Sequence, residues 1–349
     1  MSAADQLMDL ELDGGWVVEH KFVRPNNSSG GNFSVGYGVR SGERVGFLKA
    51  FDFSEAFEVG NDPMVTLQKL TTVYIHEKEL LTECGEKKLS NVVLAIDHGS
   101  VTVPNLSKME GHVYYLIFEL ATCDARIQRD ISKTKDSFWA IEVIKDATLG
   151  LWQVHRHMIA HQDIKPSNIL VYSDGVSKIA DFGRASKRGK FALHDNTPIP
   201  GDRTYAPPEL LYGFTDPDFN VRRFGCDLYM LGNLIGFMFT GSNVTALMLD
   251  QLGQQHHPSN WAGTYAEVLP YLENAFAKLI FELTSKLDAQ VGSEILPLVK
   301  ELCAPNINKR GIPSRIGKSD QYSLERYVSR IDLISKRFEI AKRLKKLVA

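Results

Sequence analysis

HQDIKPSNIL (residues 161–170) and DFG (residues 181–183) are the two stretches that decide the fold. The first contains a carboxylate, Asp163, a cation two positions later, Lys165, and an amide, Asn168. The second adds another carboxylate, Asp181. A lone His-x-Asp would be a weak signal, because aspartate is common in turns. The four residues in this order and spacing are a much more specific signal.

These residue types suit the metal-assisted transfer of a phosphoryl group. Asp163 can orient an incoming hydroxyl and accept its proton, and Lys165 can neutralise charge on the migrating group. The amide oxygen of Asn168 and the carboxylate of Asp181 can hold Mg²⁺ against phosphates. The sequence therefore predicts two catalytic residues, Asp163 and Lys165, and two metal ligands, Asn168 and Asp181.

Apolar periodicity divides the chain into a β-rich first part and a helical second part. In the first part the patterns predict strands over 35–39, 45–49, 92–96 and 113–118, a hairpin turn at 41–43 and a helix over 66–83. In the second part they predict a helix over 138–158, strands over 169–171 and 178–180, mostly helices after residue 227, and an amphipathic helix over 323–349.

The chain resembles the eukaryotic-type protein kinase family, and the resemblance extends beyond the two stretches. Residues 201–209, Gly-Asp-Arg-Thr-Tyr-Ala-Pro-Pro-Glu, are similar to the end of a kinase activation segment. Asp227, in Asp-Leu-Tyr-Met-Leu-Gly, matches the aspartate that braces the catalytic loop, so it is expected to be a buried brace and not a catalyst. Arg310 falls where the family pairs an arginine with Glu209. The resemblance covers about residues 16–312.

An upstream lysine and a glutamate also fit the family pattern. Lys49 resembles the strand lysine that contacts the α- and β-phosphates of ATP, and Glu77 resembles its ion-pair partner. Glu79 is a rival partner, because residues two apart point to different faces of a helix. Alone, Lys49 could be an edge lysine that discourages aggregation, and Glu77 could be a solvated helix residue.

The loop expected to cover the phosphates departs from the family pattern. In Ser-Gly-Gly-Asn-Phe-Ser-Val-Gly-Tyr, residues 29–37, Gly31 and Phe33 fit, but Ser34 replaces a glycine. Gly36 replaces the valine that caps adenine. Glycine lets backbone N–H groups approach phosphate closely, and a serine hydroxyl can also bond phosphate. We expect Gly31, Phe33 and Ser34 to contact the nucleotide; the alternative is a plain loop that binds no ligand.

Residues 119–123 are expected to form a hinge that binds adenine. The resemblance implies that the backbone groups of Glu119 and Ala121 bond the base, and that Phe118 forms the back wall of the site. The alternative for Phe118 is an ordinary core position. Cys123 and Asp124 lie where a polar side chain often meets the ribose, and that assignment is open.

The resemblance implies an α+β class, bilobal protein-kinase-like fold, with a small β-rich lobe and a larger, mostly helical lobe. The expected parts are an N-terminal extension (1–15), a kinase domain (16–312) and a basic amphipathic C-terminal helix (313–349). Within the domain, the small lobe is expected over 16–118, the hinge over 119–123 and the large lobe over 124–312.

The implied activity is ATP- and Mg²⁺-dependent transfer of the γ-phosphoryl group to serine or threonine hydroxyls of protein substrates. Lys165-Pro-Ser-Asn168 resembles the serine/threonine class. One alternative is a pseudokinase scaffold that binds nucleotide or partners without turnover, which the altered loop favours. Another is a small-molecule kinase of the aminoglycoside or choline type. That type lacks the Pro-Pro-Glu209 segment and Arg310.

Three further residues near the catalytic loop have predicted consequences. Gln162 stands where many regulated kinases have an arginine that pairs with a phosphorylated residue, so activity is expected not to depend strictly on phosphorylation. Asp202 replaces the usual threonine and could bond Lys165 or favour a basic residue after the acceptor. His161 is expected to support the loop structurally and not to act as an acid or base.

Composition and charge favour a cytoplasmic protein without a membrane span. The 349 residues carry a formal net charge of −2, which gives no global attraction for nucleic acid. The four cysteines are scattered, the N-terminus is acidic where a signal peptide would be basic, and the longest apolar run, residues 230–239, is short. The C-terminal helix could pack on its own lobe, bind a partner or a second copy, or lie on a membrane surface.

Overall fold

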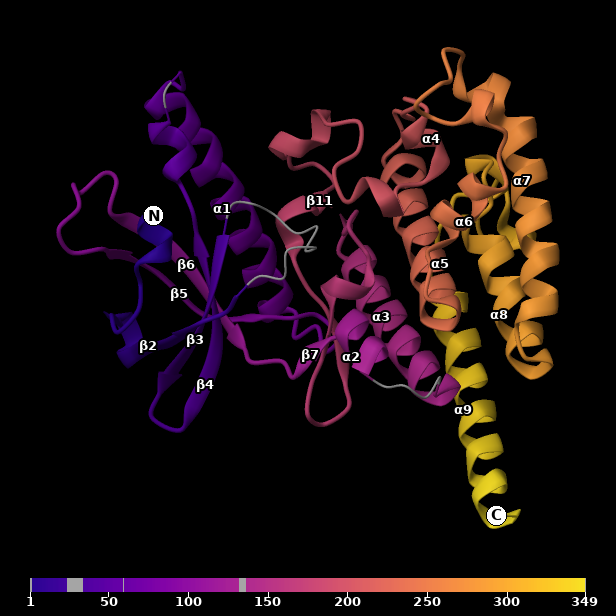
Figure 1. The fold of residues 1–349 in the computed structure, drawn as a ribbon, viewed down its shortest axis with the longest axis horizontal. Coiled ribbons are helices and arrows are strands. Elements are labelled where there is room, and N and C mark those ends of the chain that lie inside the picture. Colours follow the sequence, from indigo (N-terminus) through magenta and orange to yellow (C-terminus); the bar gives the residue numbers. More distant parts are fainter. Residues whose placement is uncertain (1, 24–33, 59, 132–135, 349) are drawn as a thin grey trace. The chain divides into compact units, whose positions relative to one another are not determined.

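The structure is a computed structural model that describes residues 2–23, 34–58, 60–131 and 136–348. The chain forms two compact units, Met1–Thr122 and Cys123–Ala349 (Figure 1). The first is β-rich and the second is mostly helical. The predicted α+β architecture with a small β-rich lobe and a larger helical lobe is confirmed.

The first unit contains one antiparallel sheet of six strands in the order β1-β2-β3-β4-β6-β5. Its elements are β1 (Glu11–Leu12), β2 (Trp16–Lys21), β3 (Ser34–Ser41), β4 (Arg44–Phe51), helix α1 (Pro63–Glu86), β5 (Ala95–Thr102) and β6 (His112–Glu119). Gly42 and Glu43 join β3 to β4, and the φ of Gly42 is 59°, which glycine adopts without steric cost. The predicted hairpin is confirmed.

The predicted strand over 92–96 is misplaced. β5 begins only at Ala95 and runs on to Thr102, paired with β6 in a register that sets Val101 opposite Val113. Val92 and Val93 are buried but lie before the strand. Residues 97–100 are polar or glycine, so the sequence shows no apolar alternation there. Their extended conformation comes from pairing with β6.

The core of the first unit includes residues from the predicted N-terminal extension. Ala4, Leu7 and Leu12 are buried in the same cluster as Trp16 and Tyr37. The hydroxyl of Tyr37 donates to the carbonyl of Ala4 at 2.7 Å. Residues 2–15 therefore pack as part of the first unit.

The second unit consists mostly of helices, and one of them, α5, is almost completely buried. Its helices are α2 (Ala125–Ile131), α3 (Ser137–Arg156), α4 (Pro208–Leu211), α5 (Gly225–Thr240), α6 (Val244–Asp250), α7 (Tyr265–Lys286), α8 (Ala289–Leu302) and α9 (Glu325–Val348). Its strands β7 (Cys123–Asp124), β9 (Ile169–Val171) and β10 (Ser177–Ile179) form one sheet, and β8 (Ile159–Ala160) pairs with β11 (Ser186–Lys187). Leu228, Leu231 and Leu234 of α5 are completely buried, as expected for a helix that is apolar on every side.

Helix α9 packs on its own unit, alongside α3 (Figure 1). Tyr327, Ile331 and Phe338 form part of its buried face. At its far end Lys342 pairs with Asp136, the N-cap of α3, at 2.7 Å. Of the three roles considered for this helix, packing on its own lobe is the one observed.

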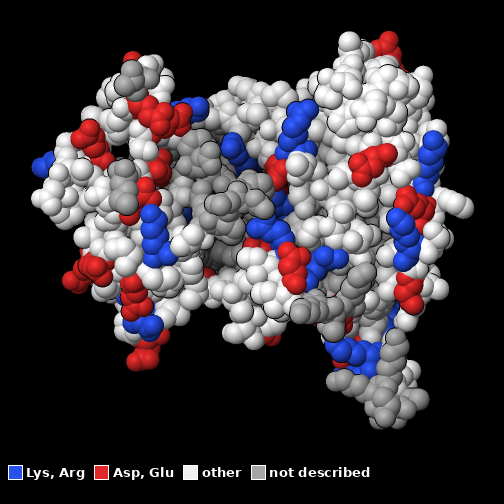
Figure 2. Space-filling model, in the orientation of Figure 1, with Lys and Arg blue, Asp and Glu red and all other residues white. Residues whose placement is uncertain are grey.

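Acidic and basic side chains are interspersed over the surface that Figure 2 shows, as the near-zero net charge predicts. Within the described ranges, no helix is both long enough and apolar enough to cross a bilayer.

Candidate active site

In the first unit, Lys49 on β4 is paired with Glu77 on α1. The ammonium nitrogen lies 2.8 Å and 3.0 Å from the two carboxylate oxygens. Glu77 is 1% exposed, and it lies on the same face of α1 as the buried residues Leu70, Tyr74 and Leu81. A buried carboxylate needs a partner. Of the two glutamates considered, Glu77 is the one that the structure pairs with Lys49.

The described part of the glycine-rich segment begins at Ser34, the first residue of β3. Two predicted nucleotide contacts, Gly31 and Phe33, lie outside the described residues. Gly36 is opposite Lys49 in the β3–β4 register. A side-chain carbon at Gly36 would lie 2.8 Å from the ring of Phe47, so this aromatic ring takes the space left by the missing valine side chain. Phe47 has no local signal in the sequence, because its contact with Gly36 depends on the strand register.

The predicted hinge residues lie at the end of the sheet. Glu119 is the last residue of β6 and is exposed, and Ala121 is half-buried. Phe118 is buried. At the start of the second unit, Asp124 accepts a hydrogen bond from the backbone N–H of Ile127 at 2.9 Å, so it acts as a local cap for α2. The nucleotide contacts expected of Phe118, Glu119 and Ala121 stay predictions.

The second unit brings the predicted catalytic residues together. Asp163 is 6% exposed, and one of its carboxylate oxygens lies 3.1 Å from the ammonium of Lys165. The amide nitrogen of Asn168 donates to that carboxylate at 2.9 Å and to the carbonyl of Asp163 at 2.8 Å. Because the nitrogen end of the Asn168 amide faces Asp163, its oxygen end points away from Asp163 and suits a metal ligand.

Asp181 is near enough to Asp163 to affect its ionisation. Burial raises the pKa of Asp163, the ammonium of Lys165 opposes this rise, and the charge of Asp181 adds to it. A raised pKa makes a carboxylate a better proton acceptor. Asp181 is itself exposed, and its φ of 66° is left-handed, which is uncommon outside glycine and often marks functional sites.

Asp227 braces the backbone of the catalytic loop, as the resemblance predicts. It is fully buried and accepts hydrogen bonds from the backbone N–H groups of His161 at 2.8 Å and Gln162 at 2.6 Å. A ring nitrogen of His161 lies 3.0 Å from the carbonyl of Ala180, just before Asp181. His161 therefore links the two stretches, in keeping with a structural role.

Asp202 lies against the catalytic pair. Its backbone N–H donates to Asp163 at 2.7 Å, and its carboxylate lies 3.4 Å from the ammonium of Lys165. Of the two roles considered for Asp202, bonding Lys165 is the one observed. Lys165 thus lies between two carboxylates.

Gly201 permits this close approach. A side-chain carbon there would fall onto the carbonyl oxygen of Gln162 and lie 2.8 Å from the carboxylate of Asp163. Glycine is required because backbone approaches backbone.

Gly201→Ala is therefore expected to push residues 201–209 off the catalytic loop and to lower turnover about 100-fold, since a displacement of about 1 Å can have this effect. The steady-state rate of the phosphoryl transfer that the sequence predicts measures the loss. Gly292→Ala is the control, because a carbon added there in α8 meets its nearest neighbour at 3.7 Å. Equal activities of the two variants would contradict the steric argument.

A buried ion pair joins Glu209 at the end of this segment to Arg310. Two guanidinium nitrogens each lie 2.7 Å from a carboxylate oxygen, which is the bidentate geometry. Arg310 is 0% exposed and also donates to the carbonyl of Gly225 at 2.9 Å. The pair implied by the resemblance is present.

Residues 55–320 match the family model described as the protein kinase domain, so the chain belongs to the protein kinase family. The match begins after Lys49, so Lys49, which pairs with Glu77, is a feature of the family pattern outside the matched residues.

Several characterised kinases are similar to the chain. It is 30% identical over 223 residues to LysM domain receptor-like kinase 10 of Oryza sativa subsp. japonica, covering 62% of this chain and 32% of that protein. It is 33% identical over 199 residues to the CTD kinase subunit alpha of Saccharomyces cerevisiae, covering 54% and 35%. It is 29% identical over 218 residues to cyclin-dependent kinase 9 of Homo sapiens, covering 59% and 54%. The chain thus spans about a third to a half of the length of these relatives.

Proposed function

We propose that the protein transfers the γ-phosphoryl group of ATP to serine or threonine hydroxyls of protein substrates. The observation that carries the proposal is the cluster of Asp163, Lys165 and Asn168 in the second unit, with Asp181 beside it. Two carboxylates, an amide and a lysine are the groups that this reaction needs.

The residues of the chain fit the cofactors of this reaction. Mg²⁺ prefers oxygen ligands and is usually held by one or two carboxylates together with substrate phosphates. The amide oxygen of Asn168 and the carboxylate of Asp181 supply such a set. When bound, Mg²⁺ would neutralise charge on the phosphates.

Each residue of the chain then has a role. Asp163 orients the acceptor hydroxyl and receives its proton on the carboxylate, whose raised pKa favours this. Lys165 stabilises charge on the transferring group, and Asp202 holds Lys165 in place. Lys49, fixed by Glu77, positions the α- and β-phosphates. Because the transition state is loose, positioning and charge stabilisation contribute more than proton removal.

Two observations favour a serine or threonine acceptor over the alternatives. Lys165-Pro-Ser-Asn168 resembles that class, and the chain is 30% identical over 196 residues to the Serine/threonine-protein kinase PknB of Mycolicibacterium smegmatis. The buried pair of Glu209 and Arg310 disfavours a small-molecule kinase. A scaffold without turnover remains the second candidate, because Phe47 fills the space beside Gly36.

Incubation with Mg²⁺ and γ-labelled ATP, with and without a generic acceptor protein, tests the proposal. Label transferred to serine or threonine of the acceptor supports it. Nucleotide binding without transfer would identify a scaffold, and transfer to small molecules alone would identify the other class.

Introducing the valine of the family pattern at position 36 is expected not to strengthen ATP binding. Gly36→Val places carbon atoms on the ring of Phe47, so we expect it to weaken ATP binding about 10-fold, within the range of overpacking effects. The double variant Gly36→Val/Phe47→Ala removes the clash and is expected to recover affinity. Isothermal titration calorimetry with ATP measures the affinities of both variants. Tighter binding by Gly36→Val alone would show that Phe47 does not occupy this space in solution.

A further inference from the structure

A second polar cluster, outside the catalytic residues, ties together the activation segment, defined here as residues 181–209. Gln162, in the catalytic loop, is 1% exposed. Its amide nitrogen donates to the carbonyl of Arg184 at 3.0 Å and to the hydroxyl of Ser186 at 2.7 Å. Its amide oxygen accepts from the guanidinium of Arg223. The neutral side chain of Gln162 thus joins the start of the activation segment to Arg223, which lies outside that segment.

Arg223 lies in a π-helical turn, Asn220–Phe224, that leads into α5. It is 5% exposed and lies 2.8 Å from one carboxylate oxygen of Asp195 and 3.1 Å from its carbonyl. A buried guanidinium needs such a partner, because an unpaired buried charge is costly.

Asp195 is the residue around which the donors converge. Ser186 donates to its carboxylate at 2.5 Å and the backbone N–H of Ala192 donates at 2.8 Å, in addition to Arg223. Arg222 donates to its carbonyl at 2.8 Å. The carboxylate therefore connects the start of the activation segment, its middle and the turn before α5.

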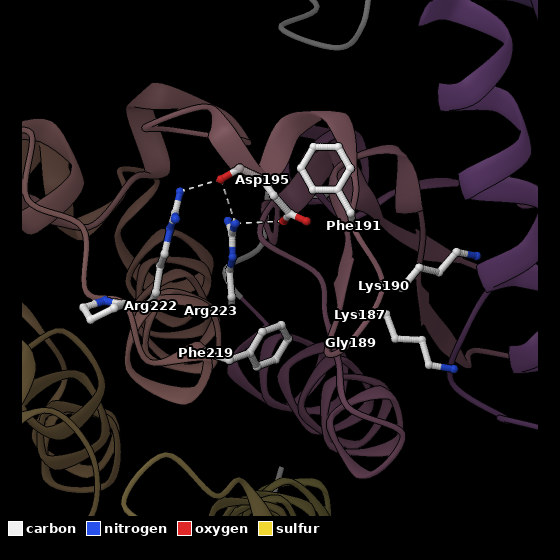
Figure 3. Close-up of a pocket in the computed structure, with 9 residues that line it drawn as sticks. Lys187, Gly189, Lys190, Phe191, Asp195, Phe219, Arg222 and Arg223 are labelled. Atoms are coloured by element: carbon white, nitrogen blue, oxygen red, sulfur yellow. Dashed lines mark hydrogen bonds and ion pairs between the residues drawn. The ribbon is translucent and has the colours of Figure 1, made fainter.

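Figure 3 shows Arg222 and Arg223 side by side and both directed toward Asp195. Lys187 and Lys190 line the same cavity of about 310 Å³, but they extend away from that carboxylate. The arrangement is an ion pair already made within the chain, and the four cations do not converge on one point that an external anion could occupy.

We propose that Asp195, paired with Arg223, is a positioning residue that holds the activation segment in its active arrangement without a phosphate group. The inference rests on the proposed function. It extends the prediction made from Gln162: the cation that the family places at position 162 is supplied by Arg223, and the anion is a carboxylate of the segment itself.

Asp195→Asn tests the pair, because it keeps the size of the side chain and removes its charge. We expect turnover to fall on the order of 10–100-fold, which corresponds to the free energy that a hydrogen bond to a charged group contributes. We also expect trypsin to cleave faster after Arg188 and Arg203, while the Kd for nucleotide is unchanged. Asp195→Glu keeps the charge and is expected to recover part of the activity. The double variant Asp195→Asn/Arg223→Met should lose less turnover than the product of the two single losses, because both variants break the same ion pair.

Arg222→Met is the matched control, since Arg222 donates to the carbonyl oxygens of Asp195 and Thr197 and its loss should be milder. A protein with Thr197→Ala, Thr204→Ala and Tyr205→Phe is expected to stay active. Loss of turnover in that folded triple variant would overturn the proposal, as would unchanged turnover and cleavage in Asp195→Asn. An inactive wild-type protein would defeat only the proposed function, because the cleavage comparison still decides the role of Asp195.

Discussion

Asp163→Asn is expected to lower turnover by about 10²–10⁴-fold, the usual effect of losing a positioned acid–base group. The asparagine has nearly the same shape, but it cannot receive the proton. It also cannot offer two acceptor oxygens to the donors that Asp163 meets, which are the amide of Asn168 and the backbone N–H of Asp202. Asp181→Ala is expected to have at least as large an effect through loss of a metal ligand.

Transfer of label from ATP, measured at saturating nucleotide, gives the size of the loss. Asp174→Asn is the control, because Asp174 lies in an exposed turn and bonds the backbone N–H of Val176. Near-normal transfer by Asp163→Asn or Asp181→Ala would contradict the assigned roles.

Arg310→Met is expected to destabilise the second unit by about 3–5 kcal/mol, because it leaves the carboxylate of Glu209 buried and unpaired. The variant Glu209→Leu/Arg310→Met removes both charges and is expected to be more stable than Arg310→Met alone. Urea unfolding followed by tryptophan fluorescence and circular dichroism measures the difference.

The adjacent residue supplies a matched control. Lys309 pairs with Glu273 at a similar distance, 2.8 Å against 2.7 Å, but its side chain is 65% exposed. Lys309→Met is therefore expected to cost about 0–1 kcal/mol, as exposed pairs do. If Lys309→Met and Arg310→Met were equally stable, the weight given to burial would be wrong.

The catalytic cluster could be predicted from the sequence because its chemistry is nearly contiguous. Asp163, Lys165 and Asn168 are separated by a few residues, and the loop geometry that unites them is local. The periodic helices were also predictable, because a long amphipathic pattern is a strong signal. The helix predicted over 138–158 is α3, which the structure places at Ser137–Arg156.

The features that were missed depend on pairings between distant residues. β5 has few apolar residues of its own and is extended because β6 pairs with it. The contact between Gly36 and Phe47 follows from the strand register. Asp195 and Arg223 are 28 positions apart and meet only once the second unit has folded. The glutamine at position 162 signalled a missing cation, but no local pattern indicated which residue replaces it.

Helix α9 has a practical consequence for recombinant production. The family match ends at residue 320, so a truncation chosen from that match alone would remove the whole helix. The face of α3 against which α9 packs would then meet water, and exposed apolar patches promote aggregation. A fragment intended for crystallisation or assay should therefore extend at least through Lys342, whose ion pair closes the N-terminal turn of α3.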